Sequence, residues 1–306
     1  MGKIAFVFSG QGAQFSGMGK SLYELGGDIK KLYDEAEGIR PGTQKQSFEG
    51  SDEELKQTKN TQPCLYLTEI ASSMALNQNG IFADGVAGFS LGEIAALAYA
   101  KAYSYTDGFK IVSKRGLLMN DAAQKFDTAM YAVLKLDKDV VDKTAKEFEK
   151  LYAVNFNCPG QTVVSGLKSS FAAFEEKIKE LGGRILPLAV SAAFHSPFMS
   201  DAAQDFGNEL KNFDIKKPEI DVYANLTAEK YGEDVISYLE NQMKSPVKWQ
   251  ETIENMINDG YTDFIEVGAG KTLCSLIKKI SKDVRVYSVQ DTDTLNETVE
   301  AIRNNA

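Results

Sequence analysis

The fold class of this chain is indicated most clearly by residues 85–95, Gly85-Val-Ala-Gly-Phe-Ser-Leu-Gly-Glu-Ile-Ala95. Its first residues, 85–89, predict a short buried strand, and an apolar helix is expected from Leu91 onward. Residues 88–92 fit Gly-x-Ser-x-Gly, a pattern in which a strand, a sharp turn and a helix present a serine at the turn. The glycines are needed because Cβ atoms beside the serine would clash there. The pattern therefore predicts a nucleophilic Ser90 at a helix N-terminus, and an ordinary strand-to-helix turn is the alternative.

On both sides of this stretch the chain alternates short strands with helical patterns, which is typical of an α/β protein with a mainly parallel sheet. The middle of the chain has a different order, βαββαβ, which is the split βαβ of a ferredoxin-like unit. We therefore expect a core of residues 1–127 and 191–306, with residues 128–190 inserted as a small subdomain. The strands of this subdomain are expected at residues 129–136, 152–157, 161–166 and 184–190, and its helices at 139–151 and 169–181.

His195 is the only histidine among the 306 residues, so a mechanism that needs an imidazole base must use it. It follows Ser90 in the chain, which is the order found in one class of serine hydrolases. Such a base takes the hydroxyl proton and later returns it to a leaving group. A limb of the pH–rate profile at roughly pH 5–8 would then belong to His195. The alternative is a structural or merely exposed histidine.

Two further features concern substrate binding. Gly10-Gln11-Gly12 follows the first predicted strand directly, so a backbone N–H of this loop is a candidate donor to an oxyanion. Arg115 is one of five arginines and stands inside an apolar helical pattern. A guanidinium near a core needs a partner, which is either an internal carboxylate or the carboxylate of a substrate.

Composition excludes several classes of protein. The net charge is −9, from 34 basic and 43 acidic residues, and this argues against a nucleic-acid binder. No run of 18 apolar residues and no signal sequence is recognised, so neither a membrane span nor export is expected. Three cysteines without a CxxC pair support neither a disulfide framework nor a zinc site, and a single histidine excludes metal sites built on two. We expect a cytoplasmic protein without a metal.

Taken together, these motifs resemble the malonyl-CoA:acyl carrier protein transacylases of bacterial fatty acid synthesis. The resemblance implies an α/β-hydrolase-like core with a ferredoxin-like insertion, in agreement with the pattern above. It covers nearly the whole chain, and the joint order of its segments is more specific than any one of them. These segments are residues 6–14, 60–63, 88–93, 114–116, 155–161, 194–195, 245–249 and 266–271.

The resemblance also implies a role for each matching residue. Ser90 is the acylated nucleophile, His195 its base and acid, and Arg115 the ligand of the free malonyl carboxylate. The implied oxyanion hole is the pair of backbone N–H groups of Gln11 and Leu91. The remaining implied roles are polar contacts from Gln62 and Asn157, a bulky Phe194 beside the substrate α-carbon, a main-chain carbonyl of Lys248 that orients the histidine, and a basic docking patch for the carrier protein at Arg184, Lys278 and Lys279.

The implied reaction moves malonyl from malonyl-CoA to the phosphopantetheine thiol of acyl carrier protein, in a monomer without a cofactor. Phe89 departs from the family, which usually has histidine before the nucleophile, and this puts a supporting role for a second histidine in doubt. Two alternatives stay open: an acyltransferase or hydrolase of a polyketide pathway, and a non-catalytic acyl-CoA-binding or scaffold protein.

Overall fold

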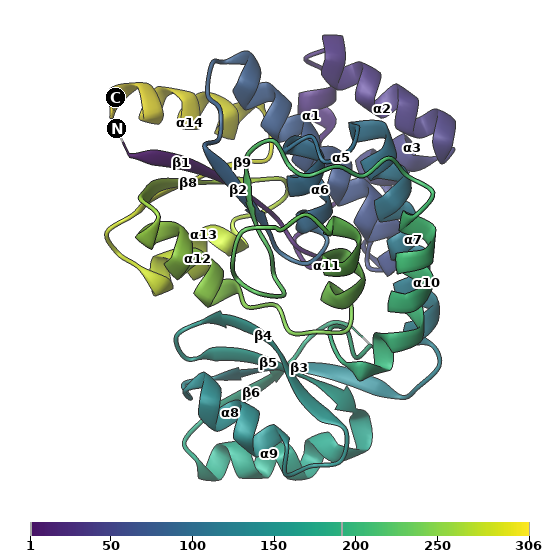
Figure 1. Ribbon diagram of the computed structural model, residues 1–306, viewed down its shortest axis with the longest axis vertical. Helices are drawn as coiled ribbons and strands as arrows, with labels where there is room; N and C mark the ends of the chain where they lie inside the picture. The colour runs from purple at the N-terminus through teal and green to yellow at the C-terminus, as the bar shows by residue number, and fades with distance from the viewer. Residues whose placement is uncertain (1, 191, 306) are drawn as a thin grey trace.

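A five-stranded parallel sheet forms the centre of the larger of two bodies (Figure 1). The protein is represented by a computed structural model that describes residues 2–190 and 192–305. The strand order is β7-β2-β1-β8-β9, so the first strand of the chain is also the middle of the sheet. The strands are β1 (Lys3–Phe8), β2 (Gly85–Gly88), β7 (Asp221–Tyr223), β8 (Tyr261–Val267) and β9 (Arg285–Val289).

Helices cover this sheet on both sides, which explains why the last four residues of β1 are fully buried. The longest of them, α5, packs against α7 and is buried along most of its length. The helices of this body are α1 (Lys20–Tyr23), α2 (Gly27–Ile39), α3 (Thr43–Glu49), α4 (Asp52–Leu55), α5 (Thr58–Gln78), α6 (Gly92–Tyr99), α7 (Tyr105–Ala123), α10 (Ser200–Leu210), α11 (Val235–Gln242), α12 (Trp249–Asn258), α13 (Thr272–Ile280) and α14 (Thr292–Asn304).

The smaller body is an antiparallel sheet of order β4-β5-β3-β6 with two helices on one face (Figure 1). Numbered within this body, the order is 2-3-1-4, which is the arrangement of a ferredoxin-like unit. Its elements are β3 (Thr128–Leu134), α8 (Lys138–Ala145), β4 (Leu151–Cys158), β5 (Gln161–Leu167), α9 (Phe171–Glu180) and β6 (Arg184–Pro187).

Strand β4 joins the two bodies. The N–H of Phe156 donates to the Val247 carbonyl at 2.9 Å, and the N–H of Val247 donates to the Val154 carbonyl at 2.8 Å. These two bonds attach the loop before α12 to the edge of the small sheet. The helices α8 and α9 lie on the far side of that sheet, so its other face is turned toward the larger body (Figure 1).

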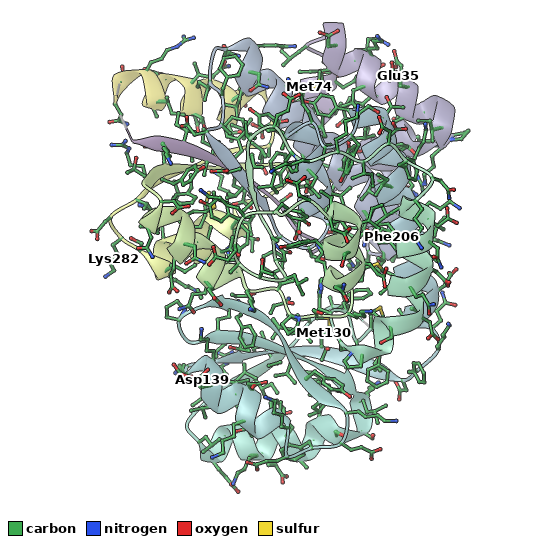
Figure 2. All side chains as sticks on the ribbon, viewed as in Figure 1. Glu35, Met74, Met130, Asp139, Phe206 and Lys282 are labelled. Atoms are coloured by element: carbon green, nitrogen blue, oxygen red, sulfur yellow. The ribbon has the colours of Figure 1, made fainter. Side chains whose placement is uncertain are left out.

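Side chains fill the interior of both bodies (Figure 2). Phe206 on α10 is buried in the core of the large body, whereas Asp139 and Lys282 project into solvent. None of the helices in the described part of the chain is long and apolar enough to cross a membrane. The predicted fold class, a mainly parallel α/β core with a ferredoxin-like insertion, is confirmed. The exact limits of that insertion, 128 and 190, stay a prediction.

Candidate active site

Ser90 stands at the sharp turn between β2 and α6. Its φ angle is +56°, a left-handed conformation that a non-glycine residue adopts only where the surroundings hold it. A Cβ on Gly88 would lie 2.0 Å from the Gly92 carbonyl carbon, and one on Gly92 would lie 2.3 Å from the Phe8 carbonyl oxygen. The two glycines therefore permit the strand and the helix to approach closely enough to project the serine.

Asn225, on the loop after β7, clamps this turn from both sides. Its amide oxygen accepts from the Ser90 N–H at 2.7 Å, and its amide nitrogen donates to the Gly88 carbonyl at 2.6 Å. The side chain is fully buried, so these bonds do not compete with water. The clamp accounts for how the strained conformation of Ser90 is maintained.

His195 lies beside the serine with a fixed tautomer. Its Nε2 is 2.7 Å from Ser90 Oγ, and its Nδ1 is 2.9 Å from the main-chain carbonyl oxygen of Gln242. A carbonyl only accepts, so Nδ1 carries the hydrogen and Nε2 is left with the lone pair. Nε2 is therefore placed to take the hydroxyl proton from Ser90.

The prediction that the main-chain carbonyl of Lys248 orients His195 was wrong. The carbonyl of Lys248 instead accepts the backbone N–H and the side-chain hydroxyl of Thr252, both at 2.9 Å, in the first turn of α12. Gln242 is the last residue of α11, and the final carbonyls of a helix have no partner within the helix. Its carbonyl is free to hold the imidazole for that reason.

Burial, together with the positive charge of nearby Arg115, lowers the pKa of His195 from its ordinary value to about 4. The imidazole is therefore neutral at physiological pH and available as a base. This also changes the expectation of a rate limb at roughly pH 5–8.

We expect kcat/KM to be insensitive to His195 titration from about pH 5.5 to 8 and to fall about tenfold per pH unit below about pH 4. The unfolded chain binds this proton near the ordinary value of 6.5, so folding stability also decreases as pH falls from 6.5 toward 4. Rates must therefore be measured on samples shown to be folded.

The same profile for Glu93→Gln serves as the control, because burial raises the pKa of Glu93 to about 7. A His195 limb that stays centred near pH 6.5 in this variant would contradict the assignment.

Arg115 is fully buried in α7, and none of the described carboxylates forms an ion pair with it. Its amino groups donate to the side-chain oxygens of Gln62 at 3.0 Å and Gln242 at 2.7 Å, and to Ser90 Oγ at 3.1 Å. Its Nε–H has no acceptor among the described residues. Burial lowers the pKa of Arg115 to about 10, which still leaves the guanidinium charged at neutral pH. A buried cation of this kind is expected to bind an anion that comes from outside the chain.

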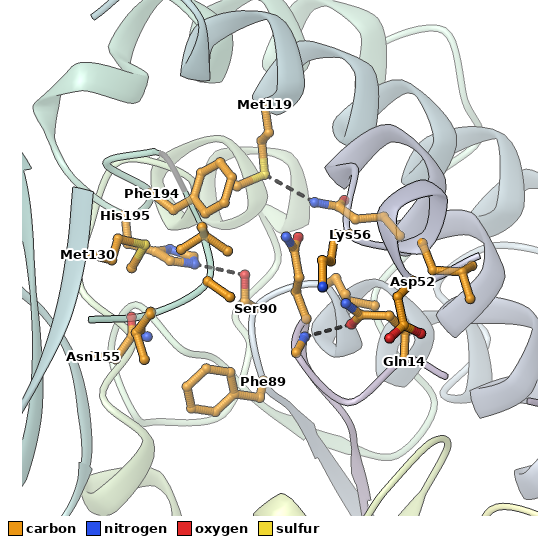
Figure 3. Close-up of a pocket in the computed structure, with 18 residues that line it drawn as sticks. Gln14, Asp52, Lys56, Phe89, Ser90, Met119, Met130, Asn155, Phe194 and His195 are labelled. Atoms are coloured by element: carbon orange, nitrogen blue, oxygen red, sulfur yellow. Dashed lines mark hydrogen bonds between the residues drawn. The ribbon is translucent and has the colours of Figure 1, made fainter. Parts of the chain in front are cut away.

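Ser90 and His195 open into a cavity of about 430 Å³ between the two bodies (Figure 3). The same cavity is lined by Gln11 and Leu91, as predicted for the oxyanion donors. Neither of their backbone N–H groups donates a hydrogen bond within the described part of the chain. Both are available to an oxyanion formed next to Ser90, which is the requirement for this role.

The cavity wall also contains the predicted Gln62 and Phe194, together with Met119 and Met130 (Figure 3). Asn157 is not among the residues that line this cavity, and its polar contact stays a prediction. It lies two residues farther along β4, near the turn to β5, and Asn155 from the same strand lines the cavity instead.

Phe89 gives the cavity an apolar side at the position where the resemblance implies a histidine. Its ring packs edge-on against Trp249, with the ring centroids 5.5 Å apart. The Ser90–His195 pair is formed without any second imidazole.

The predicted docking residues lie outside the cavity. Arg184 on β6 pairs with Leu134, which in turn pairs with Gln161, so the three side chains share one face of the small sheet. Lys279, on α13, approaches these three side chains, and its ammonium lies 3.4 Å from the Gln161 side-chain oxygen. The Lys278 ammonium instead donates to the Val284 carbonyl at 2.7 Å.

The sequence analysis missed three residues that hold the site together through hydrogen bonds: Asn225, Gln242 and Glu93. The first two lie more than 130 residues after the serine, and no local pattern marks them. Glu93 carried a signal, since it is a charged residue inside an apolar helix and is fully buried in the structure.

Comparison with known proteins places these observations in a family. Residues 5–296 match the model of the acyl transferase domain. The chain is 40% identical over 311 aligned positions to a malonyl CoA-acyl carrier protein transacylase of Bacillus subtilis, covering 99% of this chain and 98% of that protein.

Solved structures agree with this result. The malonyl CoA-acyl carrier protein transacylase of Clostridium perfringens superposes with a TM-score of 0.95 at 35% identity, covering 99% of this chain and 98% of that one. A malonyl-transacylase solved in complex with its type II PKS acyl-carrier protein superposes with a TM-score of 0.93 at 31% identity, covering 98% and 99%.

Proposed function

The chain belongs to the malonyl CoA-acyl carrier protein transacylase family of acyl transferases, and we propose that it transfers malonyl from malonyl-CoA to acyl carrier protein through an ester on Ser90. It is an acyltransferase that moves malonyl from coenzyme A to the thiol of a carrier protein. The observation that supports malonyl as the acyl group is the buried Arg115, which touches the nucleophile and has no carboxylate partner among the described residues.

In the first half-reaction Ser90 Oγ attacks the thioester carbon of malonyl-CoA while His195 Nε2 takes the hydroxyl proton. The thioester oxygen becomes an oxyanion that faces the N–H groups of Gln11 and Leu91. When this intermediate collapses, the carbon–sulfur bond breaks and the leaving thiol receives the proton from His195. The product is malonyl-Ser90, with its free carboxylate held by Arg115.

The second half-reaction repeats these steps with the phosphopantetheine thiol as nucleophile. His195 removes the thiol proton, the sulfur attacks the ester carbon, and Ser90 Oγ leaves with that proton. The side chains and backbone groups described above supply every proton transfer and charge contact in the scheme, so the proposal includes no metal or cofactor.

Arg115→Ala is expected to reduce kcat/KM for malonyl-CoA by roughly 30- to 1,000-fold, while activity with acetyl-CoA is retained or increased. A charge-assisted contact to a carboxylate contributes about 2–4 kcal/mol, which gives this range. The neutral acetyl group leaves the wild-type guanidinium buried without its partner, so the wild type discriminates against it. The measurement is kcat/KM for both thioesters.

Arg115→Lys is the matched variant, and we expect it to restore malonyl transfer poorly because a point charge does not reproduce the planar fork. Circular dichroism controls for folding. An equal loss of malonyl and acetyl activity in Arg115→Ala would make Arg115 a structural residue.

We further propose that the carrier protein docks beside β6, through Arg184, Lys278 and Lys279. The carrier protein of this family is acidic, and a local basic patch on an acidic enzyme raises the association rate. Arg184 lies on the face of the small sheet that is turned toward the larger body, and Lys279, on α13 of the larger body, approaches this face at Gln161. Leu188, just after β6, lines the catalytic cavity, so this strand leads from the patch to Ser90.

Replacing both Arg184 and Lys279 with glutamate reverses their charges. This double variant should raise the apparent KM for carrier protein by about tenfold at low salt and reduce the salt dependence of transfer. Lys278→Glu is expected to have a smaller effect because its ammonium is directed to the Val284 carbonyl. Lys31→Glu on α2, in a helix that lies at the opposite end of the molecule from α9, is the control (Figure 1). Unchanged kinetics in the double variant would eliminate this patch.

The assay that tests the function uses the purified chain, malonyl-CoA and a carrier protein with or without phosphopantetheine. Malonyl-carrier protein should form only with the modified carrier, and mass spectrometry of the carrier measures it. Comparing transfer to carrier proteins from fatty acid and type II polyketide pathways shows in which of the two pathways the enzyme acts. We propose that its partner is the carrier protein of fatty acid synthesis. A cytoplasmic monomer is part of the same proposal.

A further inference from the structure

Gln242 contacts all three groups of the proposed catalytic site. Its main-chain carbonyl holds His195, its side-chain oxygen accepts from Arg115 at 2.7 Å, and its side-chain nitrogen donates to the Ser90 carbonyl at 2.8 Å. The main-chain contact is independent of the side chain. The two side-chain contacts depend on which end of the amide faces which neighbour.

An amide group has nearly the same shape when it is rotated by 180°, but its oxygen accepts and its nitrogen donates. In the observed orientation the oxygen faces the guanidinium. In the reversed orientation two groups of N–H donors would face each other, and Arg115 would lose an acceptor. The position of Arg115 therefore depends on what selects the orientation of Gln242.

Two acceptors face the Gln242 side-chain nitrogen and favour this orientation, the main-chain carbonyl of Ser90 at 2.8 Å and the carboxyl group of Glu93. Glu93 is the one of the two that a substitution can remove. One of its oxygens, Oε2, accepts from the Gln242 side-chain nitrogen at 3.1 Å and from the Asn225 N–H at 3.0 Å. Its other oxygen, Oε1, is hydrogen-bonded to the Tyr231 hydroxyl. Two N–H donors point at Oε2, so it remains an acceptor even when the carboxyl carries a proton, which then resides on Oε1.

The position of this carboxyl group also explains why Arg115 is free to bind a ligand. Glu93 lies behind Gln242, so an amide separates the acid from the guanidinium. A carboxylate in direct contact would form a buried ion pair and compete with a substrate carboxylate for the same donors. Because the Gln242 side chain lies between them, the Glu93 carboxyl orients the amide without occupying the donors of the Arg115 guanidinium.

We propose that Glu93 is a positioning residue for substrate selection, which holds the Gln242 amide so that Arg115 is aligned for the carboxylate of the acyl group. The inference rests on the proposed role of Arg115. It assigns to Glu93 a part in choosing malonyl over acetyl, although Glu93 touches neither substrate nor the reacting atoms.

Glu93→Met tests this, because methionine has a similar shape and its apolar end replaces the acceptor of the Gln242 nitrogen. We expect the ratio of kcat/KM for malonyl-CoA to that for acetyl-CoA to fall about tenfold. The Asn225 N–H loses its acceptor as well, so transfer of both groups will slow by a common factor, and this factor cancels in the ratio.

Two further variants separate positioning from folding. Glu93→Gln keeps an oxygen that can accept from both N–H groups, and its ratio should stay within about threefold of wild type. Tyr231→Phe removes only the partner of Oε1, and its ratio should also be retained. A normal ratio in Glu93→Met, or a ratio in Glu93→Gln as low as in Glu93→Met, would overturn the proposal.

Arg115→Ala, measured in parallel, identifies which proposal has failed. If Arg115→Ala loses selectivity and Glu93→Met does not, the positioning role is wrong and the role of Arg115 stands. If Arg115→Ala keeps the wild-type ratio of kcat/KM for malonyl-CoA to that for acetyl-CoA, the proposed contact between Arg115 and malonyl is wrong. The positioning role of Glu93, which depends on that contact, is then wrong as well.

Discussion

Ser90→Ala is expected to lower malonyl transfer to carrier protein by on the order of a thousandfold or more, because no other oxygen occupies the position from which Ser90 attacks. The variant keeps Gly88 and Gly92, so the turn between β2 and α6 is retained. Alanine at φ +56° is as strained as serine, and the clamp by Asn225 acts on the backbone N–H. Thermal unfolding should therefore change little.

The measurement is the rate of malonyl-carrier protein formation, with Ser113→Ala as the matched control. The Ser113 hydroxyl donates to a carbonyl of its own helix, at Phe109, and has no part in the site. Transfer by Ser90→Ala at a rate within tenfold of wild type would show that another nucleophile carries the acyl group.

His195→Ala is expected to reduce transfer by on the order of a thousandfold, with a residual rate from the oxyanion donors and substrate binding. No second imidazole exists in the chain to replace it. The substitution leaves a space beside Ser90 at the cavity wall, where free imidazole can bind. Added imidazole should therefore restore part of the activity of His195→Ala and none of that of Ser90→Ala.

This rescue distinguishes a missing base from a damaged fold, since imidazole does not repair a misfolded chain. Near-normal turnover of His195→Ala without imidazole would contradict the role of the histidine.

The sequence was sufficient to predict Ser90 and His195 because each carries a local or exclusive signal. The serine lies in a short pattern whose glycines have a steric reason, and the histidine has no competitor. The ferredoxin-like insertion was equally predictable, because its strands and helices follow one another along the chain with strong periodicity.

Interactions between distant segments were not predictable. Asn225 contacts Ser90, 135 positions earlier in the chain, and Gln242 contacts His195, Arg115 and Ser90, which lie 47, 127 and 152 positions earlier. Lys248 was predicted from the family resemblance alone. The fold is needed to show which carbonyl is free, because α11 ends at Gln242 with a carbonyl that accepts no helical N–H.

Strand β7 is not predictable from the sequence for a related reason. It has only three residues, and its pairing with β2 is what defines it as a strand. A stretch this short carries too little periodicity to be distinguished from a loop. It matters for the site because Asn225 follows it by two residues and is placed by it next to the turn at Ser90.

The most direct test of the account is the intact mass of the protein after incubation with malonyl-CoA alone, without carrier protein. We expect one added malonyl group per chain, located by peptide mapping on the peptide that contains Ser90, and removed when carrier protein with phosphopantetheine is added. Ser90→Ala should show no adduct. An unmodified wild-type protein under conditions where transfer proceeds, or an adduct that persists in Ser90→Ala, would contradict transfer through malonyl-Ser90.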